Sequence, residues 1–306
     1  MDKTAIVGAG VIGASWASLF LAAGKDVAVY DKSPTVEDDV TRYVEAAWPV
    51  LDKIGLTAPG RRGALSFHSS AADAVADADF VQESVPERLD IKHAIFSEME
   101  PALKAGSIVS TSASGLMVSE MQEGWRDPSR FILGHPFNPP HLIPLVEVLG
   151  NEKTADGVLD AADAFYKSVG KVTIRVQKEV AGHVSNRLQA ALWREAIHLV
   201  QSGVVSVEDV DKAVWAGPGL RWAAMGPNMI WNLAAGPGGL GEYCERYRDS
   251  FHRWWDDLGD PRLDADATEK LVSGVTEAAG GRSLDELNAA RDAMIADMQA
   301  ALAKHR

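Results

Sequence analysis

The stretch "AIVGAGVIGAS", residues 5–15, decides how the N-terminal part of this chain folds. An apolar run, Thr4–Val7, leads directly into Gly8-x-Gly10-x-x-Gly13, and helical periodicity follows. Between a strand and a helix, these glycines permit a tight turn, a close approach of backbone to a pyrophosphate, and close packing of helix on strand. The N-terminus of the helix then faces the phosphate charge. The pattern predicts a dinucleotide-binding turn, and the alternative is a glycine turn that binds no nucleotide.

The identity of the cofactor depends on the end of the next apolar run. "DVAVYD", residues 26–31, ends at Asp31, the position from which a carboxylate binds a pair of ribose hydroxyls. A carboxylate there repels a 2′-phosphate, because like charges in close contact are unfavourable. The sequence therefore predicts NAD rather than NADP. The predicted contacts in the glycine turn are Gly8, Gly10, Val11, Ile12 and Gly13.

The first part of the chain alternates short apolar runs with helical periodicity, which is typical of a mostly parallel sheet covered by helices on both faces. We expect helices near residues 11–24, 36–54, 88–103 and 154–169. The expected strands are Thr4–Val7, Val27–Tyr30, Phe80–Glu83, Ile108–Ser110, Phe131–Leu133, Leu145–Leu149 and Val172–Val176.

The second part of the chain has no strand pattern. After about Glu179, helical periodicity continues to the C-terminus, and "SVED" (206–209) and "SLDE" (283–286) are predicted capping boxes that open helices. Clusters of glycine and proline mark the turns between helices. The predicted fold class is therefore α/β, with a Rossmann-type, mostly parallel sheet domain over residues 1–177 and a smaller all-helical domain over residues 178–306.

The charge balance and the cysteine content exclude several classes of function. The chain of 306 residues has 43 acidic and 30 basic side chains and a net charge of -13, which disfavours nucleic acid and anionic membrane as partners. The uncharged stretch from Thr4 to Gly24 is broken by glycines, so it predicts neither a membrane span nor a secretory signal. The single cysteine, Cys244, excludes an internal disulfide and favours a reducing compartment, the cytoplasm.

One carboxylate, Glu147, lies in an apolar predicted strand within "GHPFNPPHLIPLVEV", residues 134–148. An unpaired charge there costs several kcal/mol, and His135 is the obvious partner. In one interpretation His135 is a plain loop histidine and Glu147 is a buried carboxylate satisfied by backbone donors. In another, both are metal ligands, although no third ligand stands at a recognisable spacing. The interpretation we favour is a general base oriented by a carboxylate: hydride leaves a carbon while its hydroxyl proton passes to the histidine. No metal is expected.

Four separated motifs together resemble those of a known family. They are the glycine turn, "STSASGL" (110–116), "GHPFNPP" leading to "PLVEV", and "KEVAGHVSNRL" (178–188). In this order they resemble the L-3-hydroxyacyl-CoA dehydrogenase superfamily over nearly the whole chain. The resemblance implies a Rossmann domain followed by a helical domain that forms a homodimer interface.

The sequence resembles two branches of that superfamily in particular. "VQKEVAG", "NPPHLIPLVEV" and "GEYCERY" (241–247) resemble the lambda-crystallin and L-gulonate 3-dehydrogenase branch. "AAWPVLDKIGL" (46–56), "QESVPERLD" (82–90) and "LWREAIHLV" (192–200) resemble L-carnitine dehydrogenases. That second branch tends to carry aspartate where this chain has Asn186, and this difference favours the gulonate-like side.

The resemblance also implies roles for individual positions. His135 takes the hydroxyl proton and Glu147 orients it, while Ser114 hydrogen-bonds the substrate oxygen and Asn186 holds the same oxygen as it becomes a carbonyl. The positions that match the nicotinamide side are Glu83, Lys92 and Ser112. Three of these residues have a purely structural role as the alternative. Ser114 and Asn186 would then cap helices, and Lys92 would be a solvated helix residue.

The choice of substrate rests on weaker features. Residues 35–67 lack the lysine-rich character that suits the phosphates of CoA, and Arg221 in "GPGLRWAAMGP" is able to bind a free carboxylate in a bidentate manner. A structural ion pair or a dimer contact is the alternative for Arg221. The aromatic residues of the helical domain either pack in the core or the dimer interface, or form a cage for a quaternary ammonium group.

The sequence thus predicts NAD-dependent oxidation of a small L-3-hydroxy acid, gulonate-like or carnitine-like, to the 3-oxo acid. An L-3-hydroxyacyl-CoA dehydrogenase is the alternative enzyme. A crystallin-like structural or binding protein of the same fold is the alternative of another class.

Overall fold

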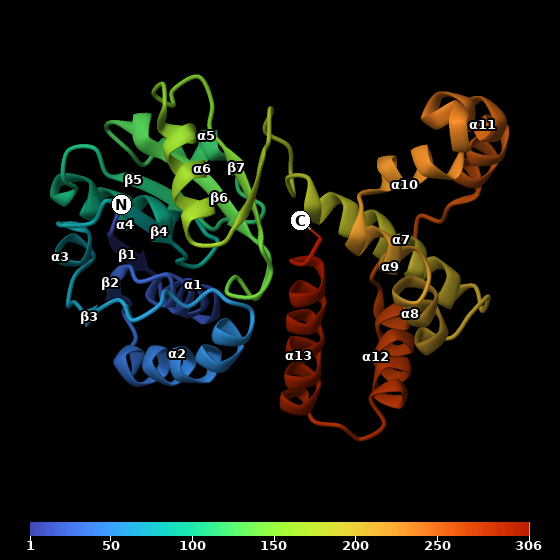
Figure 1. Ribbon diagram of the computed structural model, residues 1–306, viewed down its shortest axis with the longest axis horizontal. Coiled ribbons are helices and arrows are strands. Elements are labelled where there is room, and N and C mark those ends of the chain that lie inside the picture. Colours follow the sequence, from blue (N-terminus) through green and yellow to red (C-terminus); the bar gives the residue numbers. More distant parts are fainter. Residues whose placement is uncertain (306) are drawn as a thin grey trace. The chain divides into compact units, whose positions relative to one another are not determined.

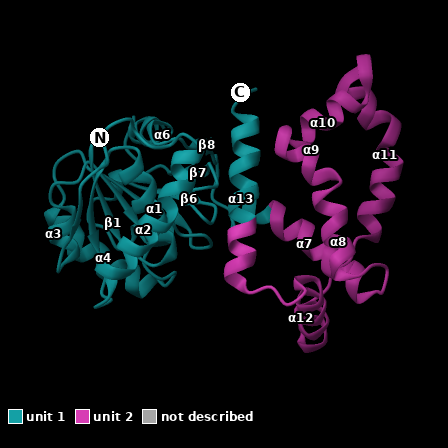
Figure 2. Ribbon diagram, turned by 60° about the horizontal axis from the view of Figure 1, so that its bottom comes forward, with its two compact units in different colours: residues 1–187, 291–306 teal, residues 188–290 magenta. Residues whose placement is uncertain are grey.

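The computed structural model describes residues 1–305 (Figure 1). These fall into two compact units, residues 1–187 with 291–305 and residues 188–290, which Figure 2 draws in different colours. The last helix, α13 (Leu284–Leu302), begins in the second unit and ends in the first. The predicted domain boundary between residues 177 and 178 stays a prediction.

The first unit is built on one eight-stranded sheet, with the order β3-β2-β1-β4-β5-β6-β7-β8. Every neighbouring pair is parallel except β6 and β7, which are antiparallel. The mostly parallel sheet predicted from the sequence is therefore confirmed. The strands are β1 (Lys3–Val7), β2 (Asp26–Tyr30), β3 (Leu65–Phe67), β4 (Phe80–Glu83), β5 (Ile108–Thr111), β6 (Phe131–Pro136), β7 (Leu145–Leu149) and β8 (Val172–Arg175).

Helices cover both faces of this sheet. Because successive side chains of a strand point to opposite faces, Ile6 of β1 belongs to one apolar cluster, and Ala5 and Val7 belong to the other. The first cluster includes residues of α1, α2 and α6, and the second includes residues of α3, α4 and α5. The helices are α1 (Val11–Ala22), α2 (Val36–Lys53), α3 (Ala71–Val75), α4 (Leu89–Met99), α5 (Val118–Gln122) and α6 (Val158–Ser168), with short 3-10 turns at Glu100–Ala102 and Pro128–Arg130.

The structure corrects the expected elements at several points. Strand β6 continues past Leu133 to Pro136, so His135 lies within a strand and is not a loop histidine. The helix expected over residues 88–103 ends at Met99 and is followed by a 3-10 turn. Strand β3 and helices α3 and α5 were not expected, because three to five residues are too few to show a period.

The second unit is all-helical, as predicted. Ser206 caps α8 by accepting a hydrogen bond from the Asp209 N–H, and Ser283 and Glu286 exchange two hydrogen bonds at the start of α13. The capping box predicted at Ser283 is thus confirmed, whereas Ser206 caps its helix through its side chain without the reciprocal hydrogen bond of a full box. The remaining helices are α7 (Ser185–Gln201), which begins in the first unit, α8 (Val207–Trp215), α9 (Pro218–Ala224), α10 (Pro227–Ala234), α11 (Gly239–Asp257) and α12 (Ala265–Ala279), with a 3-10 turn at Gly236–Gly238. Among the helices described over residues 1–305, none combines the length and the apolar character needed to cross a membrane.

Candidate active site

The glycine turn has the geometry that a dinucleotide requires. Gly8 has a φ of +87°, and a Cβ there would come within 2.5 Å of the Val85 nitrogen. A Cβ at Gly13 would collide with the carbonyl oxygen of Gly8. A Cβ at Gly10 would meet nothing within 4 Å, so this residue borders open space at the N-terminus of α1. The turn therefore packs tightly on its inner side and leaves room for a phosphate on its outer side.

A cavity of about 680 Å³ adjoins this turn and is lined by Gly8, Gly10 and Asp31, among others. Its volume is within the range of ligand sites. Asp31 lies directly after β2, and its Oδ2 accepts a hydrogen bond of 2.7 Å from the Ala9 N–H while its Oδ1 accepts one from Ser33. The residues present thus fit the adenosine half of NAD. Of the other two predicted contacts in the turn, Val11 is exposed and Ile12 is partly buried.

Glu83 and Lys92 form a buried ion pair. The Lys92 Nζ lies 2.7 Å and 2.9 Å from the two carboxylate oxygens of Glu83, and Thr111 donates a further hydrogen bond to Oε2. Such a pair is tolerable in the interior because the charges compensate each other. Lys92 is thus not a solvated helix residue, and that alternative is wrong. A contact of either side chain with the cofactor stays a prediction.

Ser112 belongs to a polar network beside this pair. Its Oγ accepts hydrogen bonds from the Gln82 Nε2 at 2.8 Å and from the Trp16 Nε1 at 3.3 Å, and it lies 2.9 Å from the Ser84 Oγ. The network continues from Gln82 to the buried hydroxyl of Tyr166. Ser112 is therefore held in place by three side chains, and its contact with nicotinamide stays a prediction.

His135 and Glu147 are in direct contact. They stand opposite each other on the antiparallel strands β6 and β7, and the His135 Nδ1 lies 2.7 Å from the Glu147 Oε2. The other carboxylate oxygen, Oε1, accepts hydrogen bonds from the Val184 N–H at 3.0 Å and from the Ser185 N–H at 2.9 Å. Glu147 is fully buried, and the Ser185 hydroxyl donates a further hydrogen bond of 3.2 Å to its Oε1.

The charge of Glu147 determines the tautomer of His135. Burial by itself raises the pKa of Glu147, but the hydrogen bonds that the carboxylate accepts outweigh this effect and hold its pKa below the ordinary value. Because an ionised carboxylate only accepts hydrogen bonds, the Nδ1 of His135 carries a hydrogen and donates it. The lone pair of the neutral imidazole is then on Nε2, which is the arrangement of an oriented base.

Ser114 contacts a residue that sequence reasoning missed, Glu87. The Ser114 Oγ donates to the Glu87 Oε2 at 2.5 Å, and the Glu87 Oε1 accepts the backbone N–H groups of Ser114, Gly115 and Leu116. Burial raises the pKa of Glu87, and these hydrogen bonds outweigh it and lower the pKa. Asn186, in the first turn of α7, has its Nδ2 3.5 Å from the Ser114 carbonyl oxygen. The structure thus places Asn186 beside the backbone of Ser114, and the role of either residue in holding a substrate oxygen stays a prediction.

A second missed residue is His183, whose ring lies next to that of His135 with 5.2 Å between the centroids. Nothing in its spacing singled it out, because the contact depends on a turn that joins β8 to α7. Arg221, the predicted carboxylate ligand, is an exposed residue of the second unit. Its guanidinium lies over the ring of Trp231, 5.6 Å from the centroid, and its contact with substrate stays a prediction.

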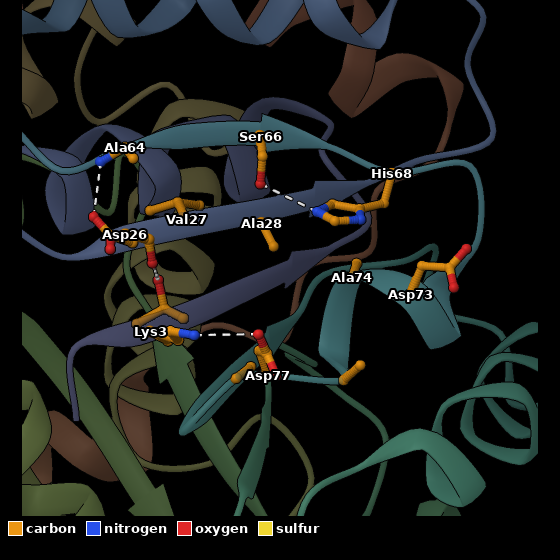
Figure 3. A pocket seen from close by; sticks show the side chains of 13 residues that line it. Lys3, Asp26, Val27, Ala28, Ala64, Ser66, His68, Asp73, Ala74 and Asp77 are labelled. Atoms are coloured by element: carbon orange, nitrogen blue, oxygen red, sulfur yellow. Dashed lines mark hydrogen bonds and ion pairs between the residues drawn. The ribbon is translucent and has the colours of Figure 1, made fainter.

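Another cavity, of about 400 Å³, lies between the sheet and α3 in the first unit (Figure 3). Lys3 and Asp77 form an ion pair of 3.1 Å along its wall, and Ser66 and His68 are joined by a hydrogen bond. None of the predicted site residues lines it. Over residues 1–305, no group of three or more His, Cys, Asp or Glu side chains is arranged to hold a metal ion.

A sheet domain with this glycine turn, followed by helices, defines a nicotinamide-dependent dehydrogenase of two domains. Both parts of the chain match one family within this class of dehydrogenases. Residues 3–180 match the NAD-binding domain of 3-hydroxyacyl-CoA dehydrogenase, and residues 182–270 match its C-terminal domain. The chain belongs to the 3-hydroxyacyl-CoA dehydrogenase family, and it is an NAD-dependent oxidoreductase that acts on CH–OH groups.

Individual relatives cover nearly the whole chain. The L-carnitine dehydrogenase of Streptomyces coelicolor is 45% identical over 290 residues, which are 95% of this chain and 91% of the relative. That of Oceanobacillus iheyensis is 38% identical and covers 95% of both chains. Among solved structures, the NAD+-dependent dismutase 5-formyl-3-hydroxy-2-methylpyridine 4-carboxylic acid 5-dehydrogenase matches with a TM-score of 0.85 and 29% identity over 99% of this chain and 98% of the other.

Proposed function

We propose that this enzyme oxidises L-carnitine, or a close 3-hydroxy acid analogue with a quaternary ammonium group, to the 3-oxo acid. The observation that carries the proposal is the 45% identity to an L-carnitine dehydrogenase over 95% of the chain. The His135–Glu147 contact supports it, because this pair supplies the base that such an oxidation requires. The carnitine-like form of the predicted substrate is thus preferred to the gulonate-like form.

In the proposed reaction, His135 removes the hydroxyl proton of the substrate. Its Nδ1–H is held by Glu147, so the Nε2 lone pair accepts the proton, and the carboxylate then stabilises the imidazolium that forms. Bound NAD supplies the acceptor for the hydride. A positioned base of this kind contributes roughly 100-fold to 10,000-fold in rate.

Ser114 and Asn186 are proposed to hold the substrate oxygen. The Asn186 amide makes only a long contact of 3.5 Å with the Ser114 carbonyl, so its Nδ2 remains available as a donor. Donation to the oxygen as it gains carbonyl character stabilises the developing charge. The hydroxyl of Ser114 takes part once it leaves Glu87, which receives its hydrogen in this structure.

Arg221 is proposed to bind the carboxylate of the substrate. Within residues 1–305 it forms no ion pair shorter than 4.0 Å, so its guanidinium is free of a competing carboxylate. Trp231, over which it lies, stacks on Tyr243 with 5.0 Å between ring centroids. Aromatic rings that already accommodate one cation provide the type of surface that a quaternary ammonium group binds.

We also propose that the enzyme is a homodimer through its helical unit. Large apolar side chains of that unit are exposed, whereas few of its residues are buried. A single chain rarely leaves so much apolar surface in water. The exposed side chains include Trp193, Trp215, Leu220, Trp254 and Trp255. Sedimentation equilibrium tests this proposal, and a monomer at micromolar concentration contradicts it.

A substrate panel read by NADH absorbance tests the activity. L-carnitine is expected to give the highest kcat/KM, ahead of L-gulonate, L-3-hydroxybutyrate and L-3-hydroxybutyryl-CoA. His135→Gln removes the base while keeping a polar side chain, and we expect it to abolish turnover without changing the melting temperature. A preference for the CoA ester, or wild-type turnover in His135→Gln, contradicts the proposal.

A further inference from the structure

His183 has an unusual backbone conformation. It is the only non-glycine residue with a positive φ within residues 1–305, at +51°. A left-handed conformation is uncommon in a non-glycine residue, and residues held this way concentrate at functional sites. The turn that imposes it continues into Val184 and Ser185, whose N–H groups bind Glu147. The strained residue therefore belongs to the structure that orients the base.

The imidazole of His183 has an unsatisfied nitrogen. The residue is 1% exposed, and its Nε2 lies 3.4 Å from the carbonyl oxygen of Ala113. Because a carbonyl oxygen only accepts hydrogen bonds, the hydrogen of the neutral ring is on Nε2 and the lone pair is on Nδ1. This buried Nδ1 has no hydrogen-bond partner among the described residues. An unpartnered acceptor of this kind is costly and requires an explanation.

Charged and titratable groups from three elements surround this ring. They are His135 on β6, Glu147 on β7, and Glu87 in the segment between β4 and α4. Burial, followed by the neighbouring His135, lowers the pKa of His183, and the hydrogen bond to Ala113 and the two carboxylates oppose this effect only in part. His183 is therefore neutral at neutral pH, and its Nδ1 remains an acceptor.

We propose that His183 is a positioning residue for the base: its neutral imidazole keeps an acceptor, Nδ1, beside His135 and stabilises His135 once it carries the substrate's proton. The inference rests on the proposed role of His135. This role accounts for three features of His183: its strained backbone, its buried lone pair and the 5.2 Å between its ring centroid and that of His135.

Of the two histidines, His135 takes the proton and His183 stays neutral. Glu147 contacts the ring of His135 directly and makes no hydrogen bond to the ring of His183. Two adjacent imidazolium rings would repel each other, so a proton on His135 keeps His183 neutral. An acceptor that stays neutral beside a base that becomes charged favours the charged form.

Three variants separate the two ring nitrogens of His183. His183→Asn places a carbonyl oxygen near the position of Nδ1, and asparagine tolerates the left-handed backbone. His183→Gln extends an amide toward Ala113, as Nε2 does, and offers no acceptor at the position of Nδ1. His183→Phe keeps only the volume of the ring. The measurements are the pH profile of kcat/KM for L-carnitine at saturating NAD, kcat, and the melting temperature.

We expect His183→Asn to keep the acid limb of the wild-type profile. In His183→Gln and His183→Phe, the acid limb is expected to move to lower pH, because protonated His135 loses its neighbouring acceptor, and kcat is expected to fall roughly tenfold. If the phenylalanine variant does not fold, the glutamine variant carries the test. Acid limbs that coincide in all variants, or that move to higher pH, overturn the inference. Wild-type turnover in His135→Gln would instead overturn the proposed function, so the two failures are distinguishable.

Discussion

Ser114 donates its hydroxyl hydrogen to Glu87 across a distance of 2.5 Å. The same carboxylate accepts the backbone N–H groups of Ser114, Gly115 and Leu116 through its other oxygen. The conformation of this loop therefore depends on one acidic side chain from the segment between β4 and α4. While that hydrogen bond is formed, the Ser114 hydroxyl has only its lone pairs left for a further hydrogen bond.

Glu87→Ala is expected to lower the melting temperature and to raise KM for L-carnitine, because it removes every acceptor that holds residues 114–116. Glu87→Gln is the matched control. Its carbonyl oxygen is able to accept the backbone N–H groups, while its NH2 donates to the Ser114 Oγ and leaves the serine hydrogen free. Equal KM values and melting temperatures for the alanine variant and the wild type would show that the loop does not depend on Glu87.

The acid stability of the protein is expected to reflect the same carboxylate. The pKa of Glu87 is lower in the folded protein than its ordinary value of 4.5, so its stabilising effect is present above that value and is lost as the pH falls through the folded pKa. The difference in melting temperature between the wild type and Glu87→Gln should therefore shrink as the pH falls below about 4.5. A difference that grows on acidification contradicts the assignment.

Glu147→Gln is expected to reduce kcat by a factor on the order of 100 or more. Both oxygens of Glu147 accept hydrogen bonds from N–H groups, with His135 at Oε2 and the turn before α7 at Oε1. The NH2 of a glutamine must face one of these donors, which either breaks the turn or reverses the tautomer of His135. Glu147→Asp retains the charge and should retain more activity. A glutamine variant within threefold of the wild-type kcat would exclude an orienting role.

Asp31→Ala is expected to reduce kcat/KM for NAD by about tenfold or more and to raise the ratio of NADP to NAD activity. The carboxylate both borders the cavity beside the glycine turn and accepts the Ala9 N–H. Asp31→Asn separates these effects, because it keeps an acceptor for the turn and removes the charge. An unchanged preference for NAD in both variants would show that Asp31 does not discriminate between the cofactors.

The stability of the protein against unfolding is expected to depend on pH because of Lys171. Its Nζ donates to the carbonyl oxygens of Pro140 and Ile143 in the segment between β6 and β7, and burial lowers its pKa from 10.5 to about 7. The ammonium form is thus disfavoured in the folded protein, and this penalty is full below about pH 7 and disappears as the pH approaches 10.5.

Wild-type stability should therefore rise relative to Lys171→Met by about 1 kcal/mol per pH unit between those limits. Urea unfolding of both proteins at about pH 7 and about pH 9 measures the difference. Lys171→Arg serves as the control, because its guanidinium stays charged over this range. A difference between wild type and Lys171→Met that stays constant with pH would contradict a titrating, buried lysine.

The features that the sequence predicted well are local ones. The glycine turn between β1 and α1, and the serine caps at Ser206 and Ser283, lie within a few neighbouring residues. Their chemistry is complete in the segment itself, so a motif is sufficient to recognise them. Strand β3 has three residues at one edge of the sheet, and it shows no comparable period.

The contacts that sequence reasoning missed join distant segments. Glu87 and Ser114 are 27 residues apart, and His183 reaches Ala113 across 70 residues. Lys92 was a solvated helix residue in one interpretation, and it is instead buried, where it pairs with Glu83 of β4. No spacing rule predicts such pairs, since they depend on how strands and turns are packed.

The sequence by itself determined the class of fold, the cofactor and the two residues that we propose as a base and its orienting carboxylate, because periodicity, glycine spacing and a carboxylate in an apolar run are local signals. The tertiary structure decided how these residues meet. The antiparallel pairing of β6 and β7 places His135 opposite Glu147, and the turn before α7 adds the N–H groups and the second histidine. Strand register and chain packing bring these groups together, because hydrogen bonds and burial act between segments that are remote along the chain.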